Sequence, residues 1–282
     1  DRPVYRHPNV KWVDGDVRDA AKVYRTLEDF RPDCIFHLAA ISRVPDCEGD
    51  PGTAAHVNVD GTYNVLQSAR ELGTPRVVFA SSAAIYGGGS RIQDETTAKA
   101  LGSSIYSMDE SAKPNPCNVY GLSKLCGEKL VELHNLMGYS AIPLRFFNVY
   151  GDYWYGGSCV DRFVRVRMEN RAGRTPAGVG KLNPTNPRRD YIHVDDVTDA
   201  IEIVAPLQVL REPINVGTGS NLSVTEVAAK VGIELEPTKP PTYMEPAATL
   251  ADTQKLDALG FTPRRTIEDY VALADRSDHV AT

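Results

Sequence analysis

The sequence predicts an α/β protein with a doubly wound parallel sheet and a smaller second lobe. Short, continuous apolar runs alternate with longer segments of helical periodicity, and this alternation repeats three times in the first half of the chain. After about Tyr150, Gly and Pro become dense and only short helical stretches stand out. Repeated strand–helix–strand units place their strands parallel, because such crossovers are right-handed and return to the same sheet.

Each element follows from its local pattern. Four buried strands are predicted from short apolar runs, at residues 10–13, 34–38, 76–80 and 141–146. Apolar residues at helical spacing predict the helices between them and in the second lobe, at residues 20–30, 53–72, 120–137, 194–204, 224–231 and 267–274. We predict a first domain over residues 1–150 and a second lobe over 151–282, with residues 190–218 returning to the first domain.

Composition excludes several classes of protein. The 282 residues hold 31 Lys and Arg against 37 Asp and Glu, so no basic excess suggests a nucleic-acid or membrane partner. No apolar run approaches the roughly 18 residues of a membrane span, and the first residues do not resemble a signal peptide. We expect a cytoplasmic protein. Its five scattered cysteines indicate reduced thiols and argue against a zinc site, and no metal site is predicted.

Tyr120 and Lys124 are the first candidates for chemistry. Four residues apart on a helix, they share one face, and an ammonium close to a phenol lowers the pKa of the tyrosine. Tyr120 would then be a general base, and Ser82, at the end of a buried strand, could hydrogen-bond the same substrate oxygen. The spacing is common, so an incidental tyrosine and a solvated lysine are the alternative. Ligands of open α/β sheets bind at the carboxyl ends of the strands, where Ser82 lies.

Eight ordered motifs carry a family resemblance across almost the whole chain. They are GDVRD at 15–19, HLAA at 37–40, VNVDGT at 57–62, SSAAIYG at 81–87, YGLSK at 120–124, LRFFNVYG at 144–151, RDYIHVDD at 189–196 and NVGTG at 215–219. The set resembles the extended short-chain dehydrogenases/reductases, and within them the nucleotide-sugar epimerases and dehydratases. The resemblance implies a Rossmann-like fold and NAD as the cofactor, with NADP left open.

The resemblance also implies which residues meet the cofactor. Asp16 and Val17 would lie along the adenine, and Leu38, Ala39 and Ala40 beneath the adenosine and pyrophosphate. The remaining cofactor residues would be Ser42, Asn58, Ala80, Ser81, Tyr120, Lys124 and Phe147. Asn58 would support the strand that carries Ser82. Alternatives from the residues themselves are that Asp16 caps the following helix, that Ala39 and Ala40 are merely small, and that Asn58 satisfies buried backbone groups.

Ser82, Asn148 and Arg189 are the predicted substrate residues. An amide and a guanidinium can hold the diphosphate of a nucleotide sugar, the guanidinium in bidentate fashion. The alternative for Arg189 is a salt bridge with Asp190 or Asp195. We interpret His193 as a packed residue near the domain junction, and the Asp195–Asp196 pair as the start of a helix rather than a metal site.

Departures from the family pattern choose among activities. Dehydratases place acids after the serine, whereas here Ala83 and Ala84 follow Ser82 and can transfer no proton. This favours a 4-epimerase, with a UDP-sugar as the favoured substrate. In the mechanism that the resemblance implies, Tyr120 would take the O4 proton while the C4 hydride passes to NAD, Ser82 would orient the hydroxyl and Lys124 would hold the nicotinamide ribose. The alternatives are an NADPH-dependent 4-ketosugar reductase, a sugar-nucleotide dehydratase and a non-catalytic scaffold.

Other departures concern segments rather than single residues. Residues 87–118 are longer and more polar than the family's connection and form either a lid or a surface excursion. An acid in the stretch 244–248 replaces the family's phosphate-binding arginine, which leaves Arg189 to bind the phosphate of the substrate. The family's opening βαβ unit with its Gly-rich turn, about 40 residues, is missing from the sequence, and we expect weak cofactor binding without it. Apolar faces of 53–72 and 120–137 predict a homodimer through a four-helix bundle.

Overall fold

The main sheet has four parallel strands. In the computed structural model, which describes residues 8–87, 108–151, 157–173 and 178–276, the strands are β1 (Ile35–His37), β2 (Val77–Ser82), β3 (Ala141–Phe146) and β7 (Ile214–Val216). They lie in the order β1-β2-β3-β7, and every neighbouring pair is parallel. Three of the four strands predicted from apolar runs are therefore confirmed, and the parallel α/β class with them.

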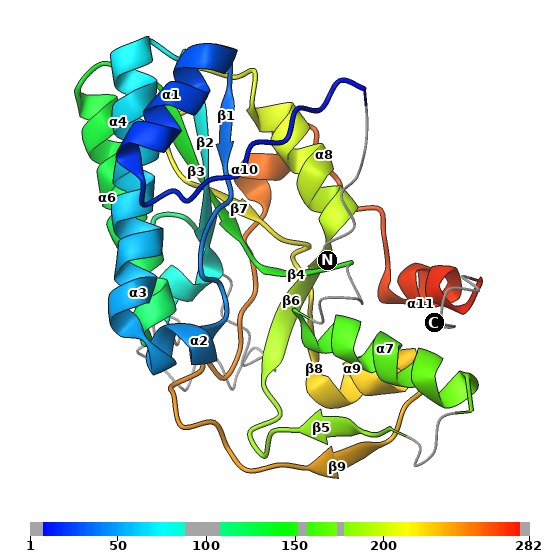
Figure 1. Cartoon of the computed structure of the whole chain (residues 1–282). Helices are drawn as coiled ribbons and strands as arrows, with labels where there is room; N and C mark the ends of the chain where they lie inside the picture. Colours follow the sequence, from blue (N-terminus) through cyan, green and yellow to red (C-terminus); the bar gives the residue numbers. More distant parts are fainter. Residues whose placement is uncertain (1–7, 88–107, 152–156, 174–177, 277–282) are drawn as a thin grey trace.

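Helices cover both faces of this sheet (Figure 1). The helices α1 (Ala20–Phe30), α4 (Gly61–Leu72) and α6 (Val119–Leu136) lie on one side, and α8 (Val194–Val204) and α10 (Gln254–Asp257) on the other. Alternate residues of β2 serve the two faces: Val77 and Phe79 pack against α4 and α6, whereas Val78 packs in a cluster with Val197 of α8. A strand buried on both sides has no polar face, which is why β2 reads as a continuous apolar run.

The predicted strand at residues 10–13 is wrong. This segment adopts neither helix nor strand, and it pairs with no strand among the described residues. Its large side chains are exposed, Trp12 by 64%. A strand is stable only when a neighbour takes up its backbone N–H and C=O groups, and an apolar run cannot supply that neighbour. The next helix, α1, begins as expected, where the Asp19 carboxylate accepts the Lys22 amide at 3.0 Å.

The predicted helix over residues 53–72 is divided into three parts. It follows α2 (Val44–Gly49) and consists of α3 (Pro51–Ala55), a π-helical turn (His56–Asp60) and α4. The wider turn directs Asn58 into the protein, where it is only 2% exposed. Such turns occur mostly as single-turn insertions in α-helices, frequently at functional sites.

Two glycines allow α6 to lie close to β2 and to the 3₁₀ turn η2 (Ala83–Tyr86) that follows it. A Cβ on Gly127 would lie 2.4 Å from the Phe79 ring, and one on Gly121 would lie 2.5 Å from the Ala84 carbonyl oxygen. The start of the helix is fixed twice. The Asn118 side chain accepts the Gly121 amide at 2.8 Å, and the Glu48 carboxylate accepts the Val119 amide at 2.8 Å.

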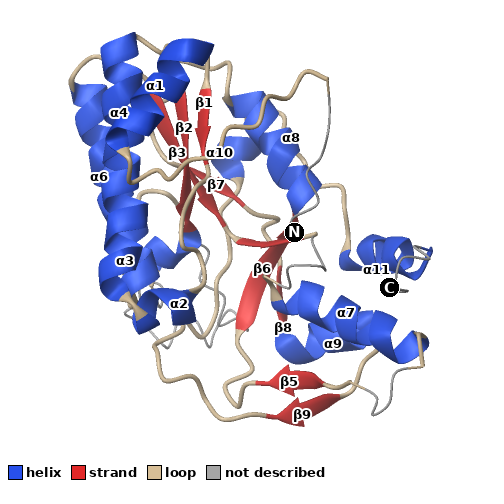
Figure 2. Cartoon of the chain, in the orientation of Figure 1, coloured by secondary structure: helices blue, strands red, loops and turns tan. Residues whose placement is uncertain are grey.

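The second lobe is built on small sheets (Figure 2). The strands β4 (Asn148–Tyr150), β6 (Arg188–His193) and β8 (Asn221–Ser223) form one sheet, and β5 (Gly180–Leu182) pairs with β9 (Leu235–Pro237). Its core lies among α7 (Cys159–Arg171), α9 (Val224–Val231) and α11 (Ile267–Arg276). The segment that contains α8 and β7 packs on the main sheet, because Ile192, Val197 and Ile214 share a cluster with Val78 and Leu144.

Candidate functional site

The carboxyl end of β2 and the first turns of α6 bring the three predicted catalytic residues together. Ser82 ends β2, and its hydroxyl oxygen accepts the Ala84 amide at 3.1 Å. Tyr120 lies in the first turn of α6, partly buried, and its phenol is close enough to the Ser82 hydroxyl for that group to affect its pKa. Lys124 lies one turn further on the same face. A hydroxyl, a phenol and an ammonium therefore meet at the sheet edge where ligands of such folds bind.

The lowered pKa predicted for Tyr120 is not found in the structure. Burial raises the pKa of Tyr120 to about 12, and the nearby Ser82 hydroxyl opposes this rise only in part. The Lys124 ammonium donates to the Ala80 carbonyl at 2.8 Å and lies 5.9 Å from the centroid of the Tyr120 ring. The spacing of the two residues on the helix was correctly read, but the direction of the lysine side chain cannot be read from spacing.

Lys124 is the most deeply desolvated cation of the site. Its side chain is 3% exposed, its Nζ lies 5.1 Å from the Phe79 ring centroid, and burial lowers its pKa to about 8. Burial, and after it the charge of Lys124, lowers the pKa of His37 to about 4. The Ala80 carbonyl accepts one of the three N–H bonds of the ammonium.

Asn58 holds the loop after β1 against α6. Its side-chain oxygen accepts the Ile41 amide at 2.8 Å, and its nitrogen donates to the Ile41 carbonyl at 3.0 Å and to the Ser123 hydroxyl at 2.9 Å. The expectation that Asn58 supports the strand of Ser82 is therefore wrong, because its hydrogen-bond partners lie in the loop and in the helix. The interpretation as a buried amide that satisfies backbone groups agrees with these bonds, and its contact with a cofactor stays a prediction.

Two of the family motifs contact each other near Asp16 and Val17. The Val17 carbonyl accepts Asn64 Nδ2 at 2.9 Å, and a Cβ on Gly61 would lie 2.6 Å from Val17 Cγ2. Asp16 does not cap the following helix. It forms a 2.6 Å ion pair with Arg18, which lowers the pKa of its carboxyl to about 2. The roles of Asp16 and Val17 toward an adenine stay predictions.

The other predicted cofactor residues divide into exposed and buried ones. At the end of β1, Leu38, Ala39 and Ser42 are exposed and Ala40 is partly exposed, so this edge is accessible to a ligand. The side chains that belong to the protein interior are those of Ala80, Ser81 and Phe147. The Ser81 hydroxyl donates to Glu128 at 2.5 Å. Phe147 packs on Tyr86, with ring centroids 6.5 Å apart, and cofactor contact for these residues remains a prediction.

Arg189 has a partner that the sequence did not indicate. Its guanidinium lies 3.6 Å from the Glu245 carboxylate and donates to the Arg188 carbonyl at 2.9 Å, while burial lowers its pKa. The alternative of a salt bridge with Asp190 or Asp195 is wrong. Asp190 accepts backbone amides and the Thr218 hydroxyl, and Asp195 faces His193 and Arg265. Asn148 lies on β4, opposite Tyr191 of β6.

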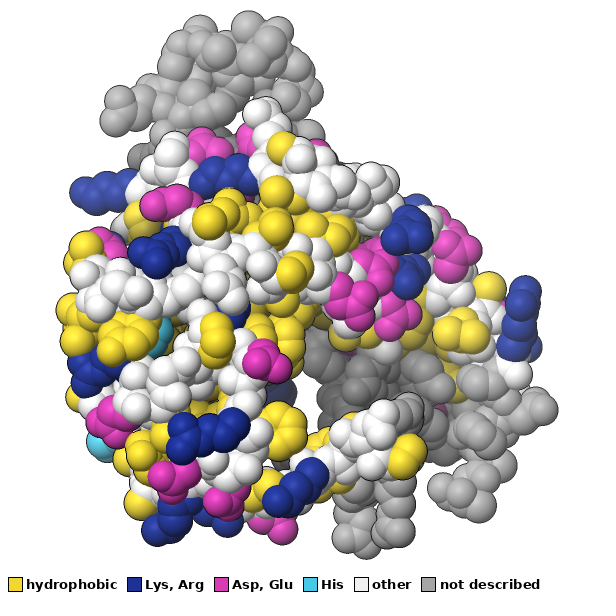
Figure 3. Space-filling view, turned by 90° about the horizontal axis from the view of Figure 1, so that it is seen from above, with side chains coloured by type: hydrophobic (Ala, Val, Ile, Leu, Met, Phe, Trp, Pro, Cys, Tyr) yellow, Lys and Arg dark blue, Asp and Glu magenta, His cyan; other side chains and the backbone are white. Residues whose placement is uncertain are grey.

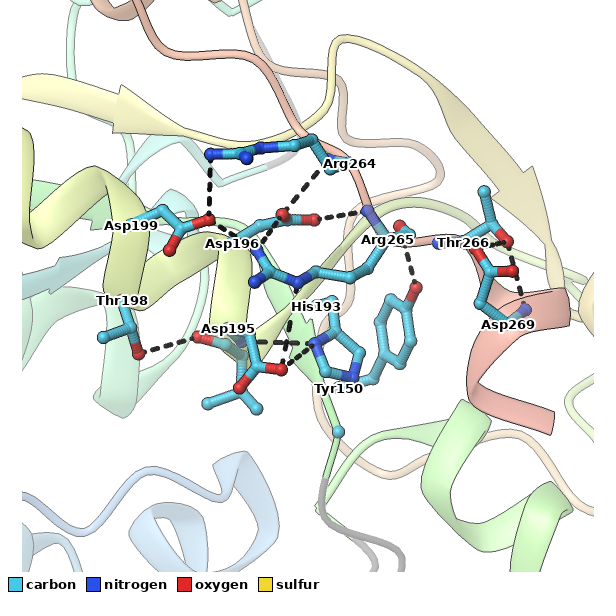
Figure 4. Close-up of polar contacts among 12 residues, drawn as sticks. Tyr150, His193, Asp195, Asp196, Thr198, Asp199, Arg264, Arg265, Thr266 and Asp269 are labelled. Atoms are coloured by element: carbon cyan, nitrogen blue, oxygen red, sulfur yellow. Dashed lines mark hydrogen bonds and ion pairs between the residues drawn. The ribbon is translucent and has the colours of Figure 1, made fainter. Parts of the chain in front are cut away.

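The junction between the lobes is shown in Figure 4. His193 is 8% exposed, its ring lies 5.2 Å from that of Tyr150, and it accepts the Asp195 amide at 3.2 Å. Asp196 is fully buried in the first turn of α8, and Arg265 donates to it at 2.7 Å. These contacts agree with a packed histidine and a helix start. The described residues contain no group of three or more His, Cys, Asp or Glu that could hold a metal.

Part of the long segment 87–118 is anchored. Met108 is 4% exposed, packs with Ile85 and Tyr86, and exchanges backbone hydrogen bonds with the stretch around Ala251. Arg145 Nη1 donates to the Glu110 carbonyl at 3.1 Å. Residues 88–107 lie outside the described part of the chain, so the choice between a lid and a surface excursion stays open.

A pocket lies at the opposite end of the sheet. It measures about 610 Å³ and is lined by loops that precede β2 and β3, including Thr74, Ser140 and Arg211. It lies far from Ser82, at the amino ends of the strands. Figure 3 shows this face, where hydrophobic side chains are exposed among Lys, Arg, Asp and Glu. We place the candidate site at the carboxyl ends instead, because the hydroxyl, phenol and buried ammonium meet there.

Three further residues near the site were not predicted. Glu48 accepts the first amide of α6, Ser123 bonds Asn58, and Glu128 accepts the Ser81 hydroxyl. For Glu128 a signal exists in the sequence, because it continues the four-residue spacing of Tyr120 and Lys124.

No helix among the described residues is long and apolar enough to span a membrane. All five cysteines are free thiols.

Comparison with known proteins gives a consistent result. A UDP-glucose 4-epimerase of Lactobacillus helveticus is 30% identical over 95% of this chain and 83% of its own length. A dTDP-L-rhamnose 4-epimerase of Burkholderia thailandensis is 29% identical over 80% of this chain and 68% of its own length. The crystal structure of a Thermus thermophilus UDP-glucose 4-epimerase in complex with NAD has a TM-score of 0.82 and 25% identity, covering 96% of this chain and 87% of that one.

The family assignment rests on the match to a family model. The model of the NAD-dependent epimerase/dehydratase family matches residues 1–217, well over half of the chain. NAD, the cofactor expected from the motifs, is the cofactor that defines this family. The chain belongs to the NAD-dependent epimerase/dehydratase family.

Proposed function

We propose that the protein is a nucleotide-sugar 4-epimerase that uses NAD and acts on a UDP-sugar. The observation that carries the proposal is the meeting of Ser82, Tyr120 and Lys124 at the end of β2, where Ala83 and Ala84 follow Ser82. Ser82 and Tyr120 can move one proton at one substrate hydroxyl. The two alanines supply no second acid, which a dehydratase needs to expel water. The relatives named UDP-glucose 4-epimerase support a UDP-sugar as the substrate.

The residues present fit NAD at the end of β1. Leu38 and Ala39 are exposed there, and the small side chains of Ala39 and Ala40 leave room for a ribose and a pyrophosphate to approach the backbone. Lys124, with further N–H donors beyond the one that bonds Ala80, would hold the nicotinamide ribose. When bound, NAD supplies the acceptor and donor of the hydride at the sugar C4.

In the proposed reaction, Tyr120 receives the proton of the sugar O4 hydroxyl. Ser82 donates to the same oxygen and orients it, so that the proton leaves along the line to the phenolate. With a pKa of about 12, Tyr120 is a protonated phenol at neutral pH and cannot accept the proton in this state. Positive charge from Lys124 and from bound NAD would therefore have to lower that pKa, so that the phenolate forms before turnover. Tyr120 returns the proton to O4 after the sugar has presented its other face, with no net change in redox state.

Arg189 would hold the diphosphate of the substrate. Its guanidinium is buried and faces Glu245, so it is a directed cation rather than a solvated one. Asn148 would add an amide donor from β4. We propose the same roles for Ser82, Asn148 and Arg189 as the family resemblance implies.

We also propose a homodimer. Large apolar side chains are exposed on α4 and α6 and in the residue that follows α6, and burial of such a surface against a second copy is favourable. They are Tyr63, Leu122, Leu133, Leu136 and Met137. Light scattering at micromolar concentration should give twice the mass of the chain, and a monomeric mass would refute the dimer.

The decisive experiment follows substrate and cofactor together. UDP-glucose is incubated with the protein and NAD, and the 4-epimer is resolved by ion-exchange chromatography. We expect conversion without net change in absorbance at the wavelength of NADH. Steady consumption of added NADPH with a 4-ketosugar would identify a reductase instead. Tyr120→Phe should lower kcat by about 10³-fold with nucleotide affinity unchanged, since it removes only the proton acceptor. Near-normal turnover would dispose of the assignment.

A further inference from the structure

We propose that Glu128 is a positioning residue: paired with Arg145, it fixes where α6 lies on β2 and thereby holds Tyr120 and Lys124 at the reacting groups. The proposal rests on the proposed function, because it concerns the same tyrosine. Glu128 touches neither a substrate nor a cofactor in this role. It acts through the helix that carries Tyr120.

Three residues on the inner face of α6 each contact the end of β2. Tyr120 lies near the Ser82 hydroxyl, Lys124 donates to the Ala80 carbonyl at 2.8 Å, and Glu128 accepts the Ser81 hydroxyl at 2.5 Å. Their spacing of four residues places them on one stripe of the helix. Three successive turns of one helix thus face three successive strand residues, and two of these contacts are hydrogen bonds.

Glu128 differs from the other two residues because it also forms an ion pair with the next strand. Arg145 of β3 donates from Nε at 2.9 Å and from Nη2 at 2.8 Å, one bond to each carboxylate oxygen. The two side chains are 7% and 4% exposed. The remaining nitrogen, Nη1, donates to the Tyr86 hydroxyl at 2.8 Å. Bidentate hydrogen bonding fixes the relative position of the two side chains, and removal of one partner leaves a buried charge without a partner of opposite charge.

Near the site, side-chain packing between α6 and β2 is reduced, because the packed residues Leu130 and Val131 lie further along the helix. Gly121 and Gly127 face the Ala84 carbonyl and the Phe79 ring, and neither presents a side chain that would block a small shift of the helix along the sheet. The position of α6 along the sheet therefore depends on another interaction. The pair of Glu128 and Arg145, which contacts both β2 and β3, provides that interaction.

The test compares two glutamates of the same helix. Glu128→Gln keeps an acceptor for Ser81 but removes the charge that Arg145 needs, whereas Glu132→Gln, the control, changes an exposed pair with Lys129. We expect Glu128→Gln to lower kcat by about 10²-fold per cofactor-loaded site, with KM within about twofold, because small misplacements of reacting groups have effects of this size. Glu132→Gln should leave both within about twofold.

Hydrogen exchange measures the position of the helix without relying on activity. Amides of residues 119–127 should exchange at least about tenfold faster in Glu128→Gln than in Glu132→Gln, while those of α4 stay unchanged. If the wild-type protein epimerises nothing, the proposed function fails, and the exchange experiment alone decides whether Glu128 fixes α6. Unchanged exchange, or wild-type kcat per loaded site, would overturn the positioning role.

A second variant covers the case in which Glu128→Gln does not fold. Ser81→Ala removes one bond to Glu128 and leaves the ion pair with Arg145 in place. We expect a smaller effect of the same kind, about tenfold in kcat with faster exchange at the start of α6. Wild-type values in both measurements would overturn the proposal equally.

Discussion

Replacement of Lys124 by methionine should make the protein more stable and inactive. Burial lowers the pKa of this lysine from 10.5 to about 8, which corresponds to about 3 kcal/mol of unfavourable free energy at neutral pH. Methionine has a similar length and no charge, so it removes this cost. It also removes the hydrogen bond to the Ala80 carbonyl, worth about 1 kcal/mol. We expect the free energy of unfolding to rise by about 2 kcal/mol at pH 7.

The pH dependence identifies the cause. Between the native pKa of about 8 and the unfolded value of 10.5, the unfolded chain binds the proton that the native protein has lost, so the wild type gains stability as the pH rises. The advantage of Lys124→Met should therefore fall by about 2 kcal/mol from pH 7 to pH 9.5, to near zero.

The assay is urea unfolding of the cofactor-free protein at both pH values, followed by circular dichroism. Lys129→Met, on the exposed side of the same helix, is the control and should stay within about 0.5 kcal/mol of the wild type. A Lys124→Met protein that is less stable than the wild type at pH 7 would refute the reasoning. So would an advantage that does not shrink with pH.

Two further predictions concern the substrate clamp and the packing of α6. Glu245→Gln should lower KM for a UDP-sugar about threefold, because it removes a negative charge that repels the substrate diphosphate at Arg189. That repulsion is worth about 0.7 kcal/mol across roughly 6 Å of solvent-like dielectric. Initial rates against substrate concentration measure KM, and a raised KM would show that Glu245 instead binds the substrate. Gly127→Ala should lower the free energy of unfolding in urea by about 2 kcal/mol, since its Cβ would lie 2.4 Å from the Phe79 ring. The control is Gly49→Ala, whose Cβ would meet nothing within 4 Å and which should not be destabilised. If both variants were as stable as the wild type, α6 could move away from Phe79 without cost.

Much of the fold could be predicted because its signals are local. The helices α1, α8 and α9 and the strand β3 have the bounds that their apolar patterns predict. The strand expected at residues 10–13 failed for the opposite reason. Its formation depends on a pairing partner elsewhere in the structure, and no local pattern reports one.

The site follows the same division between local and distant information. The meeting of Ser82 and Tyr120 was predictable from motif order and from the rule that ligand sites lie at strand ends. The partner of Arg189 was not, because Glu245 is remote in sequence and approaches only through the loop after β9. Likewise, the pKa of Tyr120 depends on burial and on the direction of the Lys124 side chain, which are properties of packing.

The π-helical turn around Asn58 has a consequence for chain length in this region. A π turn is an α-helical turn with one residue too many, so deletion of Val57 would restore a regular helix without breaking it. The segments on either side would keep nearly the same relative rotation, because the residues of a π turn cover about the same arc as one fewer residue in an α-helical turn. The loss would fall on Asn58, whose inward position depends on the wider turn and whose side chain bonds Ile41 and Ser123. Removal of one residue here should therefore leave the helix folded but release the loop after β1 from α6, a distinction that hydrogen exchange of residues 38–43 in the deletion variant would make visible.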